Sequence, residues 1–216
     1  MKRSYSFLLL TFIVLIGFTS CEKDPIINTD KKVGISNVTY YPTFTLAGDP
    51  VMSLVAGGSF TDPGATADAG GTDVPVTATG SVDASQAGLY VLNYSATNAD
   101  GFSAAASRIV VVLPEAEKPG VDLSGTYDAV SASTGTAQIS KVAPGVYYTT
   151  NCWNGATVIP VYFICTDGKV ITIPIQVTGF GSIKTDTPGS YSAGLISWDL
   201  NLVDLALVRT RKWQKQ

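Results

Sequence analysis

Apolar and polar residues alternate along short stretches of the chain, and clusters of turn-forming residues separate these stretches. Alternation with a period of two residues is typical of strands that bury one face. In the first half it predicts strands at Val38–Phe44, Ser53–Val55, Val74–Thr79, Gly88–Ala96 and Arg108–Leu113. Turn residues lie between these strands at Gly57-Gly58, Asp62-Pro63-Gly64, Gly70-Gly71 and Asp100-Gly101. This spacing predicts a small β-sandwich, whose core we expect to include Tyr90, Leu92 and Tyr94.

The second half shows the same pattern. Its predicted strands are Gly125–Asp128, Ala137–Val142, Val146–Thr150, Val158–Cys165, Val170–Val177, Gly189–Ser192 and Leu195–Asp204. Asp167-Gly168 predicts a two-residue hairpin turn. The alternation around Trp198 places this side chain in the core, together with Ile196, Leu200 and Leu202. The fold class is therefore all-β, and the second domain is an antiparallel sheet, either a small sandwich or barrel-like.

The N-terminus carries an export signal. Lys2 and Arg3 precede an apolar run, Phe7–Phe18, which is shorter than the roughly 20 residues of a membrane-spanning helix. Thr19 and Ser20 then lead into Cys21, and this junction resembles the lipobox of bacterial lipoproteins. The resemblance implies that Cys21 is lipidated and becomes the new N-terminus. The lipobox usually has Leu, Val or Ile where this chain has Phe18. The alternative is an ordinary secretory signal that leaves Cys21 as a free thiol.

Two polar segments flank the first β domain. The segment after Cys21 begins Glu22-Lys23-Asp24-Pro25 and is predicted to be a flexible tether. Its acidic start resembles the surface-export signal of Bacteroidetes lipoproteins, which implies the outer membrane facing the exterior; a periplasmic orientation is the alternative. The stretch from Pro114 to Gly120 holds two prolines, a glycine and three charges, which predicts a linker. The predicted division is a signal peptide at residues 1–20, a tether at 21–33, a β-sandwich at 34–113, a linker at 114–120 and a C-terminal β domain at 121–216.

Composition excludes several classes of function. After removal of residues 1–20, which contain Lys2 and Arg3, the chain keeps 12 basic and 17 acidic residues and a net charge of −5. This balance provides no basic patch for nucleic acid. The sequence has no histidine, the usual general base and zinc ligand. It also has no phosphate-binding glycine-rich loop. We expect a protein that is not an enzyme and that has no cofactor and no metal.

The first domain resembles a known family. The motif from Gly58 to Ala65, which contains Phe60-Thr61-Asp62-Pro63-Gly64, resembles the bacterial surface Ig-like domains also found in some pesticidal crystal proteins. Gly80-Ser81-Val82-Asp83, Gly88-Leu89-Tyr90, Tyr94–Gly101 and the closing Ser107–Val112 continue the pattern in order. This resemblance implies an Ig-like sandwich that acts as a spacer or adhesive module and carries no known catalytic residues.

The whole chain resembles a family of Bacteroides lipoproteins that combine this Ig-like module with a second β domain. Members tend to accompany polysaccharide-uptake systems. The resemblance implies a glycan-binding accessory on the outer membrane, with a lipid anchor in the membrane and polysaccharide or an outer-membrane transporter complex as partner. The alternative is a spacer or adhesin-like protein without a small-molecule ligand.

Aromatic residues in a polar setting are the candidate ligand-binding residues. Sugar rings stack on aromatic faces, and their hydroxyls need polar partners. Trp153 lies in the polar turn Asn151–Gly155, and Tyr147-Tyr148 precede it, so that one of these tyrosines faces outward. The alternative for Trp153 is packing beneath its loop. A calcium site among Asp62, Asp68, Asp83 and Asp100 is disfavoured, because their spacing lacks the dense alternation of a calcium loop.

Cys152 and Cys165 remain as an even pair if Cys21 is lipidated, and a disulfide is compatible with an exported protein. A tight turn at Asn154-Gly155 would instead place Cys152 opposite Thr157 and leave Cys165 about 26 Å away along the strand, too far for a bridge. The sequence leaves both arrangements open.

Overall fold

The computed structural model describes residues 32–33, 36–130, 134–155 and 157–216, and these residues are almost entirely strands and turns. The chain divides into two units, residues 1–40 and residues 41–216. In the first unit, β1 (Lys32–Val33) and β2 (Ser36–Asn37) form an antiparallel pair. The predicted signal peptide, Cys21 and nearly all of the tether lie outside the described residues. Within the described part of the chain, no helix is both long enough and apolar enough to span a bilayer.

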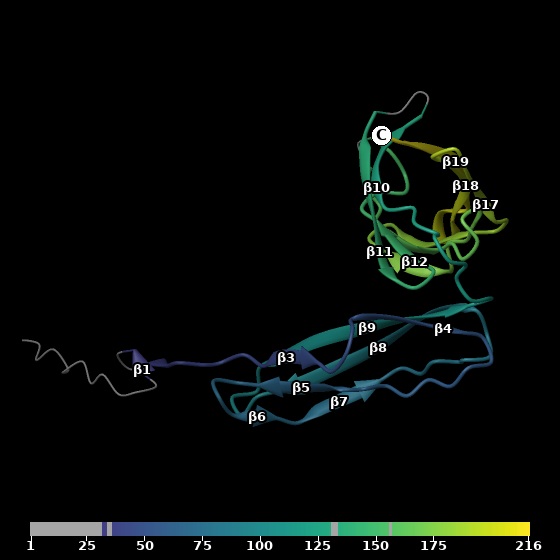
Figure 1. Cartoon of the computed structure of the whole chain (residues 1–216). Coiled ribbons are helices and arrows are strands. Elements are labelled where there is room, and N and C mark those ends of the chain that lie inside the picture. Colours follow the sequence, from purple (N-terminus) through teal and green to yellow (C-terminus); the bar gives the residue numbers. More distant parts are fainter. Residues whose placement is uncertain (1–31, 34–35, 131–133, 156) are drawn as a thin grey trace, which may run out of the picture. The chain divides into compact units, whose positions relative to one another are not determined.

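Residues 41–113 form a sandwich of two sheets (Figure 1). One sheet has the order β3–β5–β6, with bounds Thr43–Leu46, Ala65–Asp68 and Asp73–Val74. The other has the order β4–β9–β8–β7, with bounds Val51–Val55, Ser103–Leu113, Gly88–Thr97 and Val76–Thr79. The long strands β8 and β9 pair in antiparallel fashion, whereas β4 runs parallel to β9. The predicted Ig-like sandwich is confirmed.

The sandwich core combines apolar packing with one buried charge. Leu92, Tyr94 and Val110 are its most buried members, and Tyr90 lies partly buried at its edge. Arg108 of β9 has no exposed side-chain surface and forms an ion pair with Asp62. Burial of a charge is costly unless the charge is paired and hydrogen-bonded. Asp62 therefore does more than form a turn, the only role that its sequence context predicts.

The second β region is one sheet that closes on itself. Its strands are β10 (Gly125–Ala129), β11 (Thr136–Ala143), β12 (Val146–Thr149), β13 (Val161–Ile164), β14 (Val170–Ile171), β15 (Gln176–Thr178), β16 (Gly181–Thr185), β17 (Gly189–Ser192), β18 (Leu195–Leu202) and β19 (Leu207–Lys215). The order β13–β12–β11–β10–β19–β18 continues through β17 to β14. The amides of Ile164 and Thr172 then exchange hydrogen bonds with each other's carbonyls, 2.8 and 3.0 Å long, and join β13 to the end of β14. We call this barrel-like arrangement the closed sheet; β16 and the edge strand β15 extend from β18.

The inner face of the closed sheet holds the largest core. Trp198, Trp213, Tyr127, Tyr147 and Phe163 are buried in it. Ile196, Leu200 and Leu202 face the same core, as the alternation in β18 predicts. A smaller cluster combines Val111 and Leu113 of β9 with Val146 of β12 and Ile164 of β13.

The predicted linker at residues 114–120 contains no helix or strand but makes specific contacts. The amide of Lys118 donates to the Thr166 carbonyl at 2.7 Å, and the Glu117 carboxylate pairs with Lys141 at 2.8 Å. The division of residues 41–216 into two domains at this segment stays a prediction.

Several sequence expectations were wrong in detail. The strands β5, β16 and β19 were not predicted, and the strand expected at Val38–Phe44 begins only at Thr43. The strand expected at Val170–Val177 is two strands, with Pro174 between them. Asp167-Gly168 forms a turn, in which Asp167 Oδ1 accepts from the amides of Lys169 and Val170 at 2.8 Å each. This turn does not close a two-residue hairpin, because the chain on its two sides first pairs at Ile164 and Thr172, and β14 itself pairs with β17.

Candidate functional site

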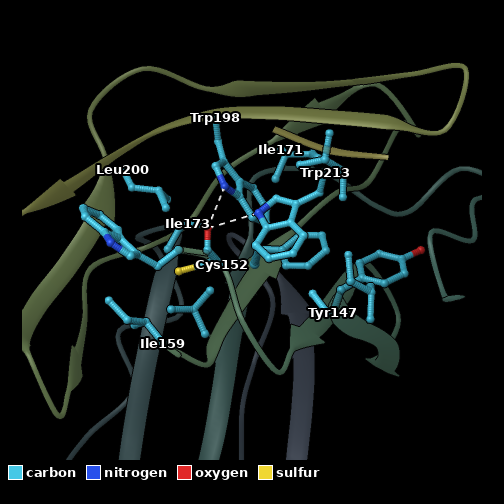
Figure 2. Close-up of a cluster of buried hydrophobic side chains, with 14 of the residues drawn as sticks. Tyr147, Cys152, Ile159, Ile171, Ile173, Trp198, Leu200 and Trp213 are labelled. Carbon is cyan, nitrogen blue, oxygen red and sulfur yellow. Dashed lines mark hydrogen bonds between the residues drawn. The ribbon is translucent and has the colours of Figure 1, made fainter. Parts of the chain in front are cut away.

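The loop after β12 enters the closed sheet and fills one part of its interior. The carbonyl of Cys152 accepts hydrogen bonds from the indole nitrogens of Trp198 at 3.3 Å and Trp213 at 3.2 Å (Figure 2). Asn151 Oδ1 accepts from the amides of Trp153 and Ile159 at 3.0 and 3.2 Å, which closes the loop on itself. Two buried indoles would otherwise lack acceptors, so this loop is part of the core.

Two of the three predicted ligand-binding aromatics are buried. Tyr147 has no exposed surface; its ring stacks on Phe163 with centroids 5.3 Å apart. Its hydroxyl donates to the Val121 carbonyl at 3.1 Å, and burial raises the pKa of this hydroxyl. Trp153 is only 8% exposed and belongs to the core cluster, and Arg211 lies over its ring at 4.4 Å. Trp153 thus takes the packed alternative, and neither ring offers a free face for stacking.

Cys152 and Cys165 are free and buried, so the candidate disulfide is not formed. The turn at Asn154 has a different register from the predicted one. Asn154 pairs with Thr157, and the Cys152 amide donates to the Ile159 carbonyl at 2.8 Å. Cys152 therefore lies level with Ile159, and Cys165 follows about 20 Å further along an extended chain. Burial raises the pKa of both thiols, so they stay protonated near neutral pH and are poor nucleophiles.

Tyr148, the third predicted aromatic, points outward and has an aromatic partner that the sequence did not single out. Tyr148 of β12 lies directly opposite Tyr162 of β13, and their ring centroids are 5.1 Å apart at an interplanar angle of 52°. Both side chains are half-buried. The amide and carbonyl of Tyr162 bond to the side chain of Gln176 at 2.9 and 2.7 Å. Strand alternation through Val161-Tyr162-Phe163 could have revealed that Tyr162 faces away from the largest core; its ring packs against the smaller cluster that contains Val146 and Ile164.

Hydroxyl and amide side chains continue the outer surface beside the two rings. Ser140 of β11 lies directly opposite Tyr148, and Gln138 lies two residues before it on the same face. Gln138 Oε1 accepts from the Thr126 hydroxyl at 3.0 Å, and the Gln138 amide donates to the Thr150 hydroxyl at 2.9 Å. We call this surface the tyrosine face; its members are Thr126, Gln138, Ser140, Tyr148, Thr150 and Tyr162.

The tyrosine face combines the two requirements of a sugar-binding surface. Tilted tyrosine rings present apolar faces and hydroxyls at the same place. Neighbouring hydroxyls and amides can donate to and accept from sugar hydroxyls.

Acidic side chains are used in local structure. A pocket of about 300 Å³ is lined by both Glu115 and Asp167. Glu115 accepts from the Thr166 hydroxyl at 3.1 Å. Backbone amides hold the pKa of Asp167 below its ordinary value, whereas the general acid of a glycosidase needs a raised pKa. In the described residues no three of Cys, Asp and Glu gather as metal ligands; Asp68 and Asp83, for example, accept from Gly71 and Ser85 in turns.

Comparisons with known proteins bear on the sandwich. Residues 44–112 match the family model described as bacterial surface protein, Ig-like domain, which confirms the resemblance drawn from the motif around Asp62. No curated protein matches the chain. Among solved structures, the chain is similar to the crystal structure of a lipoprotein from Bacteroides thetaiotaomicron. The identity is 24%, the TM-score is 0.38, and the match covers 81% of this chain and 100% of that chain.

Proposed function

We propose that this chain is a lipid-anchored protein of the bacterial outer membrane that faces the exterior and binds glycan without catalysis, as an accessory of a polysaccharide-uptake system. The observation that carries the binding role is the tyrosine face, where Tyr148 and Tyr162 form an outward aromatic pair beside Ser140 and Gln138. The Ig-like match at residues 44–112 supports a place at the cell surface. Protonated thiols and the absence of histidine from the sequence favour binding over chemistry.

The tyrosine face is tested by single substitution. The mature chain is titrated in a calorimeter with a panel of plant and host polysaccharides. We expect saturable heat with at least one of them and a loss of about tenfold or more in affinity for Tyr148→Ala, because truncation of an aromatic anchor costs about 2 kcal/mol. Tyr41→Ala is the control, since Tyr41 also pairs with an aromatic ring, Phe102, at a centroid distance of 5.1 Å, although it is more exposed than the half-buried Tyr148.

Thermal melts of both variants accompany the titrations. The proposed role requires that Tyr148→Ala melts close to the wild type while losing affinity. Equal affinity of the Tyr148→Ala variant and the wild type would remove the tyrosine face as the binding site. Absence of heat with every polysaccharide would refute the glycan-binding role.

The anchor is tested separately from binding. Cys21→Ala should abolish fatty-acid labelling and release the protein from the membrane fraction, because the thiol is the site of lipid attachment. Protease accessibility on intact cells then distinguishes an exterior from a periplasmic orientation. Unchanged labelling of Cys21→Ala would refute the lipid anchor, whatever the result with glycans.

A second candidate function is protein interaction, with an outer-membrane transporter as partner. Edge strand β15 favours it, because Val177 is 85% exposed and Ile175 is 57% exposed. Unpaired edges with apolar side chains are ready sites for another chain. If the partner is an outer-membrane transporter, Val177→Lys should abolish cross-linking to that transporter in cells, whereas Tyr148→Ala should leave cross-linking unchanged.

A further inference from the structure

Two arginines lie side by side on the inner face of β19. Side chains at alternate positions of a strand share a face, so Arg209 and Arg211 lie on the same face as Leu207 and the buried Trp213. The register places Arg211 opposite Trp198 and Arg209 opposite Leu200. Both opposing side chains belong to the core. Arg209 is exposed and Arg211 is half-buried; we call their two guanidinium groups the arginine pair.

Arg211 is held in place by aromatic contact instead of an ion pair. Its guanidinium carbon lies 4.4 Å from the centroid of the Trp153 ring. Its Nη1 donates to the carbonyl of Thr210 at 3.1 Å, and its buried Nε has no hydrogen-bond partner. In the described residues the ion pairs are Arg108–Asp62, Lys141–Glu117 and Lys184–Asp186, and none of them involves the arginine pair.

The two positive charges of the arginine pair have no carboxylate partner among the described residues. Burial lowers the pKa of Arg211, and the positive charge of Arg209 lowers it further. On the opposite face of β19, the Asp199 carboxylate accepts a hydrogen bond from the Thr210 hydroxyl at 2.6 Å. Arg209 Nη1 donates only to the carbonyl of Val208, at 2.8 Å. Two adjacent cations thus retain donors that a negative group could satisfy.

We propose that Arg209 and Arg211, of which Arg211 packs on Trp153, bind an anionic group, a carboxylate or a sulfate, carried by the polysaccharide that this protein captures. This inference rests on the proposed glycan-binding function and narrows the ligand to acidic polysaccharides. A guanidinium presents parallel donors that match two oxygens of a carboxylate or sulfate. Stacking on Trp153 fixes the plane of the Arg211 fork, so less rotamer freedom is lost when the anion binds.

The first experiment tests the arginine pair with small anions. The mature chain is labelled with nitrogen-15, and the arginine Nε–Hε signals are followed by NMR while sodium sulfate or sodium galacturonate is added. Arg211→Lys and Arg209→Gln assign the signals. We expect a saturable shift of the Arg211 signal with at least one anion, and no such shift with sodium chloride at equal ionic strength. An Arg211 signal that responds to all three salts alike overturns the inference.

The second experiment tests whether the anionic group is bound as part of a polysaccharide. Calorimetry compares a polyuronate oligosaccharide, a sulfated oligosaccharide and a neutral glucan, so that the carboxylate and sulfate arms are separate. We expect Arg209→Glu to weaken binding of the acidic ligand by about tenfold or more, because a charge-assisted hydrogen bond is replaced by repulsion. Lys212→Glu is the matched control: it makes the same change in net charge on the same strand, but its exposed side chain lies on the opposite face.

The outcomes separate this inference from the proposed function. Equal losses for Arg209→Glu and Lys212→Glu mean general charge attraction and overturn the inference. Binding of an acidic ligand that depends on Tyr148 but not on Arg209 leaves the proposed function intact and overturns the inference. A saturable shift of Arg211 without binding of any polysaccharide keeps the anion site but refutes the glycan-binding function.

Discussion

Each β region of this protein places an arginine against an aromatic ring, and the two arginines have opposite surroundings. In the sandwich, Arg108 lies 5.8 Å from the centroid of the Tyr94 ring, and Asp62 accepts from both the guanidinium and the Tyr94 hydroxyl. In the closed sheet, Arg211 lies 4.4 Å from the centroid of the Trp153 ring and has no carboxylate partner among the described residues. Arg108 is wholly buried, whereas Arg211 keeps some exposed surface.

This difference teaches how to separate structural from functional charges. A fully buried cation requires an acid and carbonyl acceptors, and Arg108 has Asp62 together with the carbonyls of Ala47 and Gly64. The Nε of Arg108, like that of Arg211, has no hydrogen-bond partner, but the wholly buried side chain leaves a ligand no access to it. A partly exposed cation that is positioned by an aromatic ring but unpaired stays accessible to a ligand.

The largest effect on stability is expected for truncation of Trp153, the ring on which Arg211 packs. Trp153→Ala should lower the free energy of unfolding by about 3–5 kcal/mol, because a core aromatic is removed and leaves a cavity. Denaturant unfolding measures it. A variant as stable as the wild type would show that Trp153 is not packed in the core. Trp153 could then not be the ring that positions Arg211.

The second largest effect on stability is expected for Asp62, the carboxylate partner of Arg108 in the sandwich. Asp62→Ala leaves the buried Arg108 without its counter-charge and should cost about 3 kcal/mol, the lower end for a broken buried pair, because the Asp62 side chain is 27% exposed. Asp68→Ala is the control, since Asp68 supports only an exposed turn through the Gly71 amide. Similar losses for both variants would contradict the structural role of the Arg108–Asp62 pair.

The same pair predicts a pH dependence. Although burial raises the pKa of Asp62, hydrogen bonds from Tyr94 and Gly64 and the charge of Arg108 outweigh it and lower the pKa. A carboxyl group whose pKa is lower in the folded state stabilises the fold above its unfolded value of about 4 and loses this contribution as the pH falls further. The stability difference between the wild type and Asp62→Asn should therefore shrink below about pH 4. A difference that stays constant down to acid unfolding would exclude the pair as its source.

The smallest effect is expected at Arg211. Arg211→Gln should change the free energy of unfolding by about 1 kcal/mol or less, because the losses are a cation–π contact and one exposed hydrogen bond to the Thr210 carbonyl. Thermal melts at matched ionic strength measure it, with Lys212→Gln as control. A loss as large as that of Asp62→Ala would make Arg211 a structural charge like Arg108 and would erase the contrast between the two regions.

The sequence predicted strands well where one face is uniformly apolar. The alternation Ile196, Trp198, Leu200 and Leu202 gave β18 and its buried face correctly. Strand β19 escaped prediction because Arg209 and Arg211 occupy inward positions where the pattern requires apolar residues. Without β19 the ring of strands cannot close, so the topology of the second region could not be derived.

The site was predicted in part for a related reason. Period-two alternation required one of Tyr147 and Tyr148 to face outward, and the structure selects Tyr148. Its partner Tyr162 depends on strand register, which no local pattern specifies. Likewise, Arg108 and Asp62 are 46 positions apart, so the turn context of Asp62 was the only signal available.

The parallel pairing of β4 with β9 bears on how the protein carries mechanical load. With the lipid anchor proposed above, drag on the C-terminal region would be transmitted through the sandwich that contains these two strands. Because they run in the same direction, tension at the start of β4 and at the end of β9 acts along the strands, and their five register pairs share it. The pairing at these five positions must break simultaneously in shear, instead of one pair after another. We therefore expect the Ig-like module to resist extension in the direction in which flow at a cell surface would pull it.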